Sequence, residues 1–128
     1  MSGYWTCFAY KDYEPHHLHC THKYLGVQPY LHIWDIIEIT AHYFENFIFE
    51  VPVVNFNKIE WFEPGIRVLL PSEPVILLPV LRTMLDEYRD DDFPYNPHVT
   101  CYTEDGINKP FTKYCLVKND EIIAQWGL

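Results

Sequence analysis

The segments HCTHKYLG (residues 19–26) and PHVTCYTE (residues 97–104) decide the interpretation of this chain. Each contains a His-x-Thr tripeptide, HCT at residues 19–21 and HVT at residues 98–100, and each follows a loop that contains proline. The β-branched and aromatic residues around both tripeptides predict β-strands. Because side chains alternate between the two faces of a strand, the His and the Thr of each tripeptide project to the same side. Two such strands lying side by side would bring two imidazoles and two hydroxyls into one pocket.

This set of side chains suits the cleavage of a phosphodiester. One imidazole, that of His19 or His98, removes a proton from the attacking hydroxyl or water, and the other protonates the departing oxygen. Since the ordinary pKa of histidine is about 6.5, both protonation states coexist near neutrality. The hydroxyls of Thr21 and Thr100 can donate to the non-bridging phosphate oxygens. Lys23 falls on the same strand face by alternation, and we expect it to add a positive charge near the phosphate. The scheme needs no metal and no other cofactor.

Hydrophobic periodicity and turn residues predict interleaved strands and helices around the two tripeptides. Several neighbouring strands are joined by short turns, which is typical of an α+β fold with a mainly antiparallel sheet. We expect one domain over residues 1–128. Helices are predicted at residues 29–45 and 78–88, and strands at residues 4–10, 19–25, 47–56, 58–62, 66–70, 98–103, 114–117 and 121–126.

Length, composition and charge restrict the function. The chain has 128 residues, of which 48% are hydrophobic and 21% charged, as in one globular domain. Nine Lys and Arg against eighteen Asp and Glu give a net charge of -9. That charge opposes binding of a long nucleic acid polymer, which needs a basic surface, but it is compatible with a small anionic ligand in a local pocket. No apolar run approaches the roughly 20 residues that span a bilayer, and the first residues lack signal-peptide features, so we expect a cytoplasmic protein without membrane contact.

A zinc site is an alternative use of the histidines and cysteines at residues 16–22. Alternation places Cys20, His22 and Cys101 on faces opposite to the tripeptide histidines, so one tetrahedral zinc could not collect them without breaking the strands. We therefore expect no bound metal. The cysteines lack CxxC spacing and the density of a small secreted scaffold, so reduced and mostly buried thiols are expected at Cys7, Cys20, Cys101 and Cys115.

Aromatic residues make up 17% of the chain, and some are candidates for stacking on nucleobases. Trp61 precedes the FEPG turn beside Phe62, so alternation sends these two rings to opposite faces, one toward the core and the other toward the cleft. Tyr10 in the first strand and Trp126 in the closing hairpin are candidates for a second stacking surface. Packing in the hydrophobic core is the alternative role for each ring.

The two tripeptides, with a helix, a strand pair and a second helix between them, resemble the motifs of the 2H phosphoesterases. The LigT-like fold of that family carries two H-x-[ST]-x motifs on neighbouring strands. The resemblance covers nearly the whole chain, up to the closing hairpin YCLVKNDEIIAQWGL at residues 114–128. It implies a two-lobed α+β fold with mainly antiparallel sheets, helices outside and the site in a central cleft. It further implies that His19 and His98 are the acid and the base, and that Thr21 and Thr100 hold the phosphate.

The chain is short for this family, with one strand before the first motif. In this compactness it is similar to the phage anti-CBASS phosphodiesterases, which are 2H proteins that degrade the cyclic di- and trinucleotides used by bacteria as antiviral signals. The resemblance therefore implies a small cyclic nucleotide as the substrate, cleaved at 3',5' phosphodiester bonds, and the cytoplasm of a host as the location. Other members act on 2',3'-cyclic nucleotides or RNA ends, and the motifs do not separate these substrates. A protein that sequesters a nucleotide without cutting it is a further alternative.

Overall fold

The computed structural model describes residues 3–15, 17–47, 51–63, 66–71, 78–88, 97–101 and 110–127. Its strands form one sheet in the order β3-β4-β5-β2-β1-β6-β7, in which every described pair of neighbours is antiparallel. The predicted α+β class with an antiparallel sheet is confirmed. The strands are β1 (Tyr4–Tyr10), β2 (Cys20–Gly26), β3 (Phe56–Glu63), β4 (Ile66–Pro71), β5 (Val99–Cys101), β6 (Phe111–Lys118) and β7 (Glu121–Gly127).

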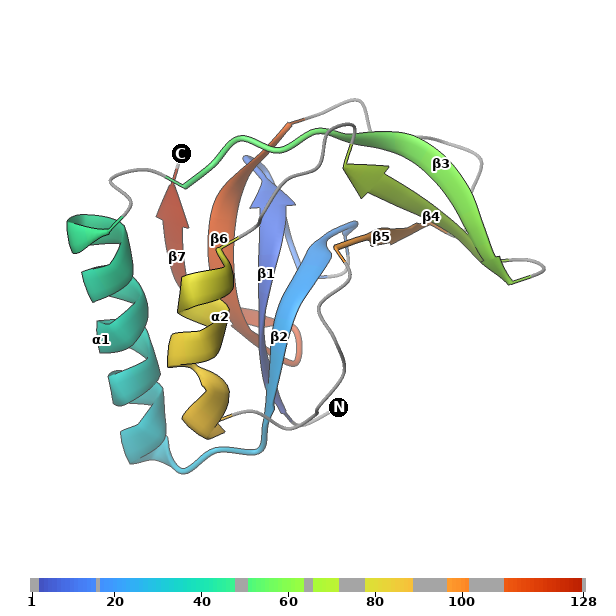
Figure 1. Ribbon diagram of the computed structural model, residues 1–128. Coiled ribbons are helices and arrows are strands. Elements are labelled where there is room, and N and C mark those ends of the chain that lie inside the picture. The colour runs from blue at the N-terminus through green and yellow to red at the C-terminus, as the bar shows by residue number, and fades with distance from the viewer. Residues whose placement is uncertain are drawn as a thin grey trace.

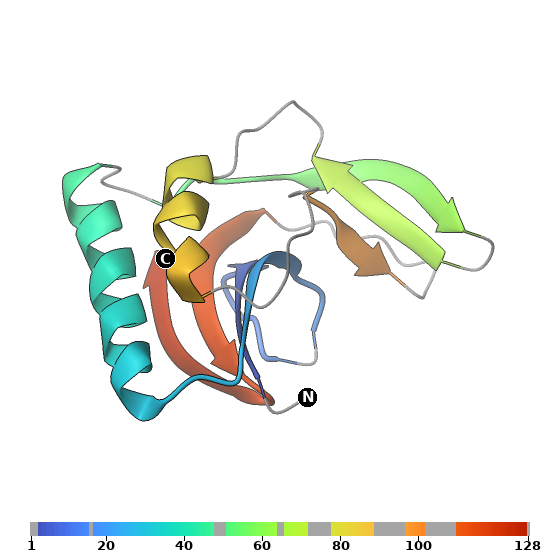
Figure 2. The same ribbon diagram turned by 60° about the horizontal axis from the view of Figure 1, so that its bottom comes forward.

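Two helices cover one face of one half of this sheet. Helix α1 (Tyr30–Asn46) and helix α2 (Pro79–Met84), which is followed by the 3₁₀ turn η1 (Asp86–Tyr88), lie over strands β2, β1, β6 and β7 (Figures 1 and 2). The strands β3, β4 and β5 extend beyond the helices. The main core lies beneath α1, where the ring of Phe44 is 5.6 Å from that of Tyr114 on β6. In the described part of the chain, no helix is long and apolar enough to cross a membrane.

The helix predicted from residue 29 is confirmed, the helix predicted at residues 78–88 is confirmed over Pro79–Met84 and followed by a 3₁₀ turn, and one strand prediction is wrong. Helix α1 begins one residue after the predicted start at Pro29, as expected when a proline occupies the helix entry. The predicted strand at residues 47–56 is absent from residues 51–55 except for a single bridge between Val54 and Phe111, and β3 begins only at Phe56. Pro52 lacks a backbone N–H and cannot complete a ladder there. Residues 102–103, the end of the strand predicted at residues 98–103, lie outside the described residues.

A β-bulge in β2 reverses the alternation of side chains partway along the strand. Thr6 on β1 faces Lys23, whereas the next residue, Cys7, faces Thr21, so His22 is the extra residue of the bulge. As a result, His22 and Lys23 are both buried. Their side chains contact residues at the ends of α2 rather than opposite faces of the sheet.

The buried imidazole of His22 connects the sheet to the start of α2. Its Nε2 donates to the carbonyl oxygen of Leu78 at 3.3 Å, so Nδ1 is left as the acceptor for the hydroxyl of Tyr114 at 2.7 Å. Leu78 has a left-handed backbone conformation with φ of 47°, which an L-residue adopts only with support from its surroundings. The fully bonded imidazole is therefore a structural group that supports the entry to α2.

We expect His22→Leu to lower the free energy of unfolding by about 2–4 kcal/mol. The substitution leaves the Tyr114 hydroxyl and the Leu78 carbonyl buried without this partner, at about 1–3 kcal/mol for each group. Urea denaturation followed by circular dichroism measures the change. The control is His42→Leu on the exposed side of α1, which should change stability by less than about 0.5 kcal/mol. Equal effects of the two substitutions would contradict the structural role of His22.

Candidate active site

The site begins with one pair of facing residues, Cys20 on β2 and Val99 on β5. Both side chains are fully buried members of the main core. Cys20–Val99 is the pair that the structure records between β2 and β5, and continuing its antiparallel register by one residue on each side puts Thr21 opposite His98 and His19 opposite Thr100. Alternation sends these four side chains to the sheet face that the helices do not cover. The pairing therefore brings both tripeptides together on one face.

His19, which immediately precedes β2, is held in a defined orientation. Its Nδ1 donates to the carbonyl oxygen of His17 at 2.9 Å. The imidazole centroid lies 4.5 Å from the ring of Trp5, tilted by 40°, and 5.9 Å from the ring of Tyr13 in a T-shaped contact. Because Nδ1 carries the proton, Nε2 keeps its lone pair in the neutral ring. That nitrogen is the one prepared to accept a proton.

The surroundings of His19 lower its pKa below the ordinary value. Burial of the imidazole is the largest cause, because it disfavours the charged form. The hydrogen bond to the His17 carbonyl acts in the opposite direction, and a positive charge on His98 lowers the pKa further. His19 is therefore predominantly neutral at pH 7, and His98 is near enough for its charge to act on His19.

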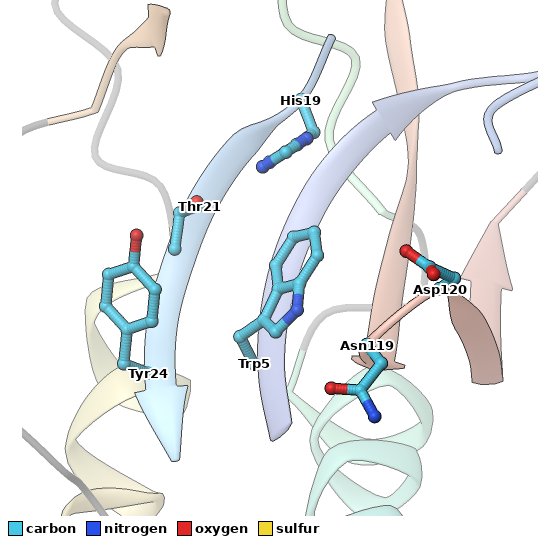
Figure 3. Close-up of a pocket in the computed structure, with 6 residues that line it drawn as sticks. All are labelled: Trp5, His19, Thr21, Tyr24, Asn119 and Asp120. Atoms are coloured by element: carbon cyan, nitrogen blue, oxygen red, sulfur yellow. The ribbon is translucent and has the colours of Figure 1, made fainter. Parts of the chain in front are cut away.

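A cavity of about 500 Å³ lies next to this histidine on the uncovered face of the sheet. Figure 3 shows three side chains of the β2 segment on one side of it, the indole of Trp5 in the middle and the turn between β6 and β7 on the other side. Trp5 and Tyr24 are cross-strand partners, so two aromatic rings lie beside the catalytic candidates. The described lining consists of Trp5, His19, Thr21, Tyr24, Asn119 and Asp120.

A small second core lies beside the cavity under the loop that joins β1 to β2. It contains Cys7, Ala9, Cys115, Val117 and the ring of Tyr13, with Trp5 packed against it. Burial raises the pKa of the Cys7 thiol. The prediction of reduced, buried cysteines is confirmed for Cys7, Cys20 and Cys115, and the side chain of Cys101 lies outside the described part of the structure.

The prediction that Lys23 shares a face with His19 and Thr21 is wrong. The bulge in β2 turns Lys23 to the helix side, where its Nζ donates to the carbonyl oxygen of Arg82 at 2.6 Å and forms an ion pair with Asp86. The side chain is buried and its charge is already paired. Lys23 is thus placed to connect β2 to α2 and not to contact a phosphate in the cavity.

The predicted aromatic residues do not line the described cavity. Trp61 is 65% exposed on β3, so it is not a core residue. Glu60 faces Val68, which faces Thr100, so the register places Trp61 on the face opposite to Thr100. Trp126 packs against the core rings of Phe44 and Tyr114, and Tyr10 packs between the two core clusters, stacked on His17 at 6.1 Å.

Sequence reasoning missed four residues of the lining. Trp5 was detectable in part, because alternation places it on one face of its strand with Cys7, but its position beside His19 depends on the pairing of β1 with β2. Asn119 and Asp120 are readable from sequence as a turn, yet their proximity to Trp5 comes from the pairing of β1 with β6. Tyr24 lies on the cavity side only because of the bulge.

The described part of the chain contains no cluster of side chains that would support the alternative of a zinc site. Among these residues, no group of three or more His, Cys, Asp or Glu side chains is arranged to hold a metal ion. Cys20 is in the main core, and His22 bonds to Leu78 and Tyr114, so both are on the opposite side of β2 from Thr21.

We expect His98→Gln to raise the pKa of His19. The substitution removes a positive charge that disfavours the protonated form of His19, so the ring should titrate at higher pH. Two-dimensional NMR of the imidazole protons across pH 4–9 measures the titration. His42→Gln, on the outer side of α1, is the matched control and should leave the titration unchanged. If the pKa of His19 is the same in His98→Gln as in the wild type, the two tripeptides are not in electrostatic contact.

The sequence and the structure were compared with known proteins. No family model matches the sequence, and the searches of curated proteins and of solved structures each gave no match.

Proposed function

We propose that this protein is a phosphodiesterase in which His19 and His98 transfer protons and Thr21 and Thr100 bind the phosphate. The observation that supports it is the Cys20–Val99 pairing, whose register gives both tripeptides one face of the sheet. Two titratable imidazoles and two hydroxyl donors on one face of a sheet are the groups that phosphodiester hydrolysis requires. One of each, His19 and Thr21, lines the described cavity, and His98 and Thr100 do not.

His19 is assigned as the general base of this reaction. Its Nδ1 is engaged with the His17 carbonyl and its pKa is lowered, so Nε2 accepts the proton of the attacking water or hydroxyl at neutral pH. The attacking oxygen forms a bond to phosphorus as the bond to the leaving oxygen breaks. His98 donates its proton to that leaving oxygen. Thr21 and Thr100 donate to the non-bridging oxygens, where negative charge increases in the transition state.

The proposed substrate is a small cyclic nucleotide. By its resemblance to the 2H phosphoesterases, cleavage of 3',5' bonds in cyclic di- or oligonucleotides is the first candidate activity, with a role in phage counter-defence within the host cytoplasm. In the proposed two-lobed LigT-like arrangement, β3, β4 and β5 belong to one lobe and β2, β1, β6 and β7 to the other. The tripeptides then lie where the lobes meet, because Cys20 and Val99 join β2 to β5.

A 2',3'-cyclic mononucleotide is the second candidate, and the described lining of the cavity favours it. About 500 Å³ is in the range of small-ligand sites, roughly 300–1,000 Å³. The described lining offers one pair of aromatic rings, Trp5 and Tyr24, while Trp61 lies on another strand and another face. Chromatography after incubation with cyclic dinucleotides and with 2',3'-cyclic mononucleotides separates the two candidates. Recovery of every nucleotide intact after heat denaturation of the protein would instead indicate sequestration.

We expect His19→Ala and His98→Ala each to lower turnover by about 10² to 10⁴-fold while the fold is retained, as for the loss of a general acid or base. The rate on the substrate identified by chromatography and the circular dichroism spectrum are measured together. The control is His42→Ala, which should keep the wild-type rate. A rate near that of wild type in either of the first two variants would contradict the assignment.

The pH dependence of kcat/KM in the wild type follows from the same assignment. Activity requires neutral His19, so kcat/KM should rise with pH through the pKa of His19, which lies below the ordinary value of about 6.5. Turnover should persist in EDTA. Loss of activity in EDTA that manganese or zinc restores would exclude the metal-independent mechanism.

We expect Thr21→Val and Thr100→Val to lower the rate by roughly 10 to 10³-fold, because each removes one hydroxyl donor and keeps the β-branched shape. The loss should be the same on every substrate, since all share the phosphate. Rates on substrates with different bases give the comparison. A loss confined to one base would place the altered threonine at the base instead of the phosphate.

A further inference from the structure

The cavity next to His19 contains groups that the proposed chemistry does not use. The rings of Trp5 and Tyr24 offer stacking surfaces, and the amide of Asn119 and the carboxylate of Asp120 lie on the other side of Trp5 from Thr21 (Figure 3). Stacking on an aromatic ring and hydrogen bonds to its edge are the two ways in which proteins bind an exposed nucleobase. The end of the cavity away from the tripeptides thus has the composition of a base-binding site.

Charge determines which part of a nucleotide lies at each end of this cavity. A carboxylate accepts hydrogen bonds and repels a phosphate, so Asp120 disfavours a phosphate at its own end. The phosphate is therefore directed to Thr21 and His19, and an uncharged edge rich in donors is directed to Asp120. A ring stacked over Trp5 has its edges toward these two ends, because Trp5 lies between them in Figure 3.

The backbone holds Asp120 in position. Residues 119 and 120 form a two-residue turn, since Lys118 and Glu121 face each other at the ends of β6 and β7. Asn119 has a positive φ of 52°, which asparagine tolerates better than most residues. A short turn between two paired strands fixes the backbone from which the exposed side chain of Asp120 extends.

We propose that the cavity recognises guanine, stacked on Trp5 with its N1–H and N2 amino group on the carboxylate of Asp120; this rests on the proposed phosphodiesterase function and names its base. Guanine is the common base that presents two adjacent donors, which match the two oxygens of a carboxylate. Adenine and cytosine place a ring nitrogen acceptor beside their amino group, which would face a carboxylate oxygen. Uracil has one N–H between two carbonyl acceptors. Asp120 therefore attracts the donor edge of guanine and repels the acceptors that the other bases present.

Direct binding tests this proposal without any need for turnover. Guanosine 3'-monophosphate and adenosine 3'-monophosphate, neither of which contains a phosphodiester, are titrated into the wild-type protein in a calorimeter. We expect the guanine nucleotide to bind about 10 to 100-fold more tightly, the selectivity of one good bidentate contact to a base. Inosine 3'-monophosphate, which lacks the N2 amino group, should bind with intermediate affinity. Equal affinity for the guanine and adenine nucleotides, or no binding of either, overturns the proposal.

The variant Asp120→Asn keeps the shape of the side chain and replaces one acceptor by a donor. It should weaken binding of the guanine nucleotide by about 10-fold or more and strengthen binding of the adenine nucleotide, because the amide offers a donor to the ring nitrogen of adenine and an acceptor to its amino group. The matched control is Glu121→Gln, which removes a charge from the adjacent exposed residue outside the cavity lining and should preserve the selectivity. Equal weakening of both nucleotides by Asp120→Asn overturns the assignment to Asp120.

The two proposals fail in different ways. Selective binding of the guanine nucleotide with no hydrolysis of any cyclic nucleotide would support the base site and overturn the phosphodiesterase. Hydrolysis of guanine and adenine substrates with equal kcat/KM, together with equal binding of the two monophosphates, would support the phosphodiesterase and overturn the base site.

Discussion

The cross-strand pair formed by Cys20 and Val99 is the constraint on which the other features of this structure depend. It joins β2 to β5 and so connects the two halves of the sheet. Both side chains are buried in the main core, which fixes the face on which their neighbours lie. A slip of one residue in this pairing would turn the histidine and the threonine of one tripeptide into an apolar core, where polar groups without partners are costly. Burial of two small side chains thus specifies the register that assembles the polar face.

The bulge in β2 separates the structural and the chemical roles of neighbouring residues. Before the bulge, Cys20 packs in the core and Thr21 lies in the cavity lining; after it, Lys23 is paired with Asp86 and Tyr24 lines the cavity. The bulge therefore diverts a permanent positive charge away from the cavity. Within the two tripeptides, the imidazole rings are then the groups that can offer a positive charge to a phosphate. The charge of an imidazole depends on pH.

How far the sequence predicts the structure differs from residue to residue. Alternation correctly separates Thr21 from Cys20 and His22, because these positions precede or form the bulge. Alternation fails at Lys23, because a bulge arises from the pairing of two strands and cannot be recognised from the sequence of a single strand. The choice between Trp5 and Trp61 depends on strand order: β1 is the neighbour of β2, and β3 is an edge strand. Both tryptophans occur in strand-like segments, so local patterns do not distinguish them.

The position of β1 has a consequence for how the protein is made. This strand pairs on one side with β2 and on the other with β6, so residues 4–10 lie against residues 111–118. The cavity takes Trp5 from β1 and Asp120 from the turn after β6. Contacts so distant in sequence form late, because closing the long loop between them costs chain entropy. A nascent chain therefore cannot complete the cavity until residues 111–127 have left the ribosome, and the half-made protein has no assembled site.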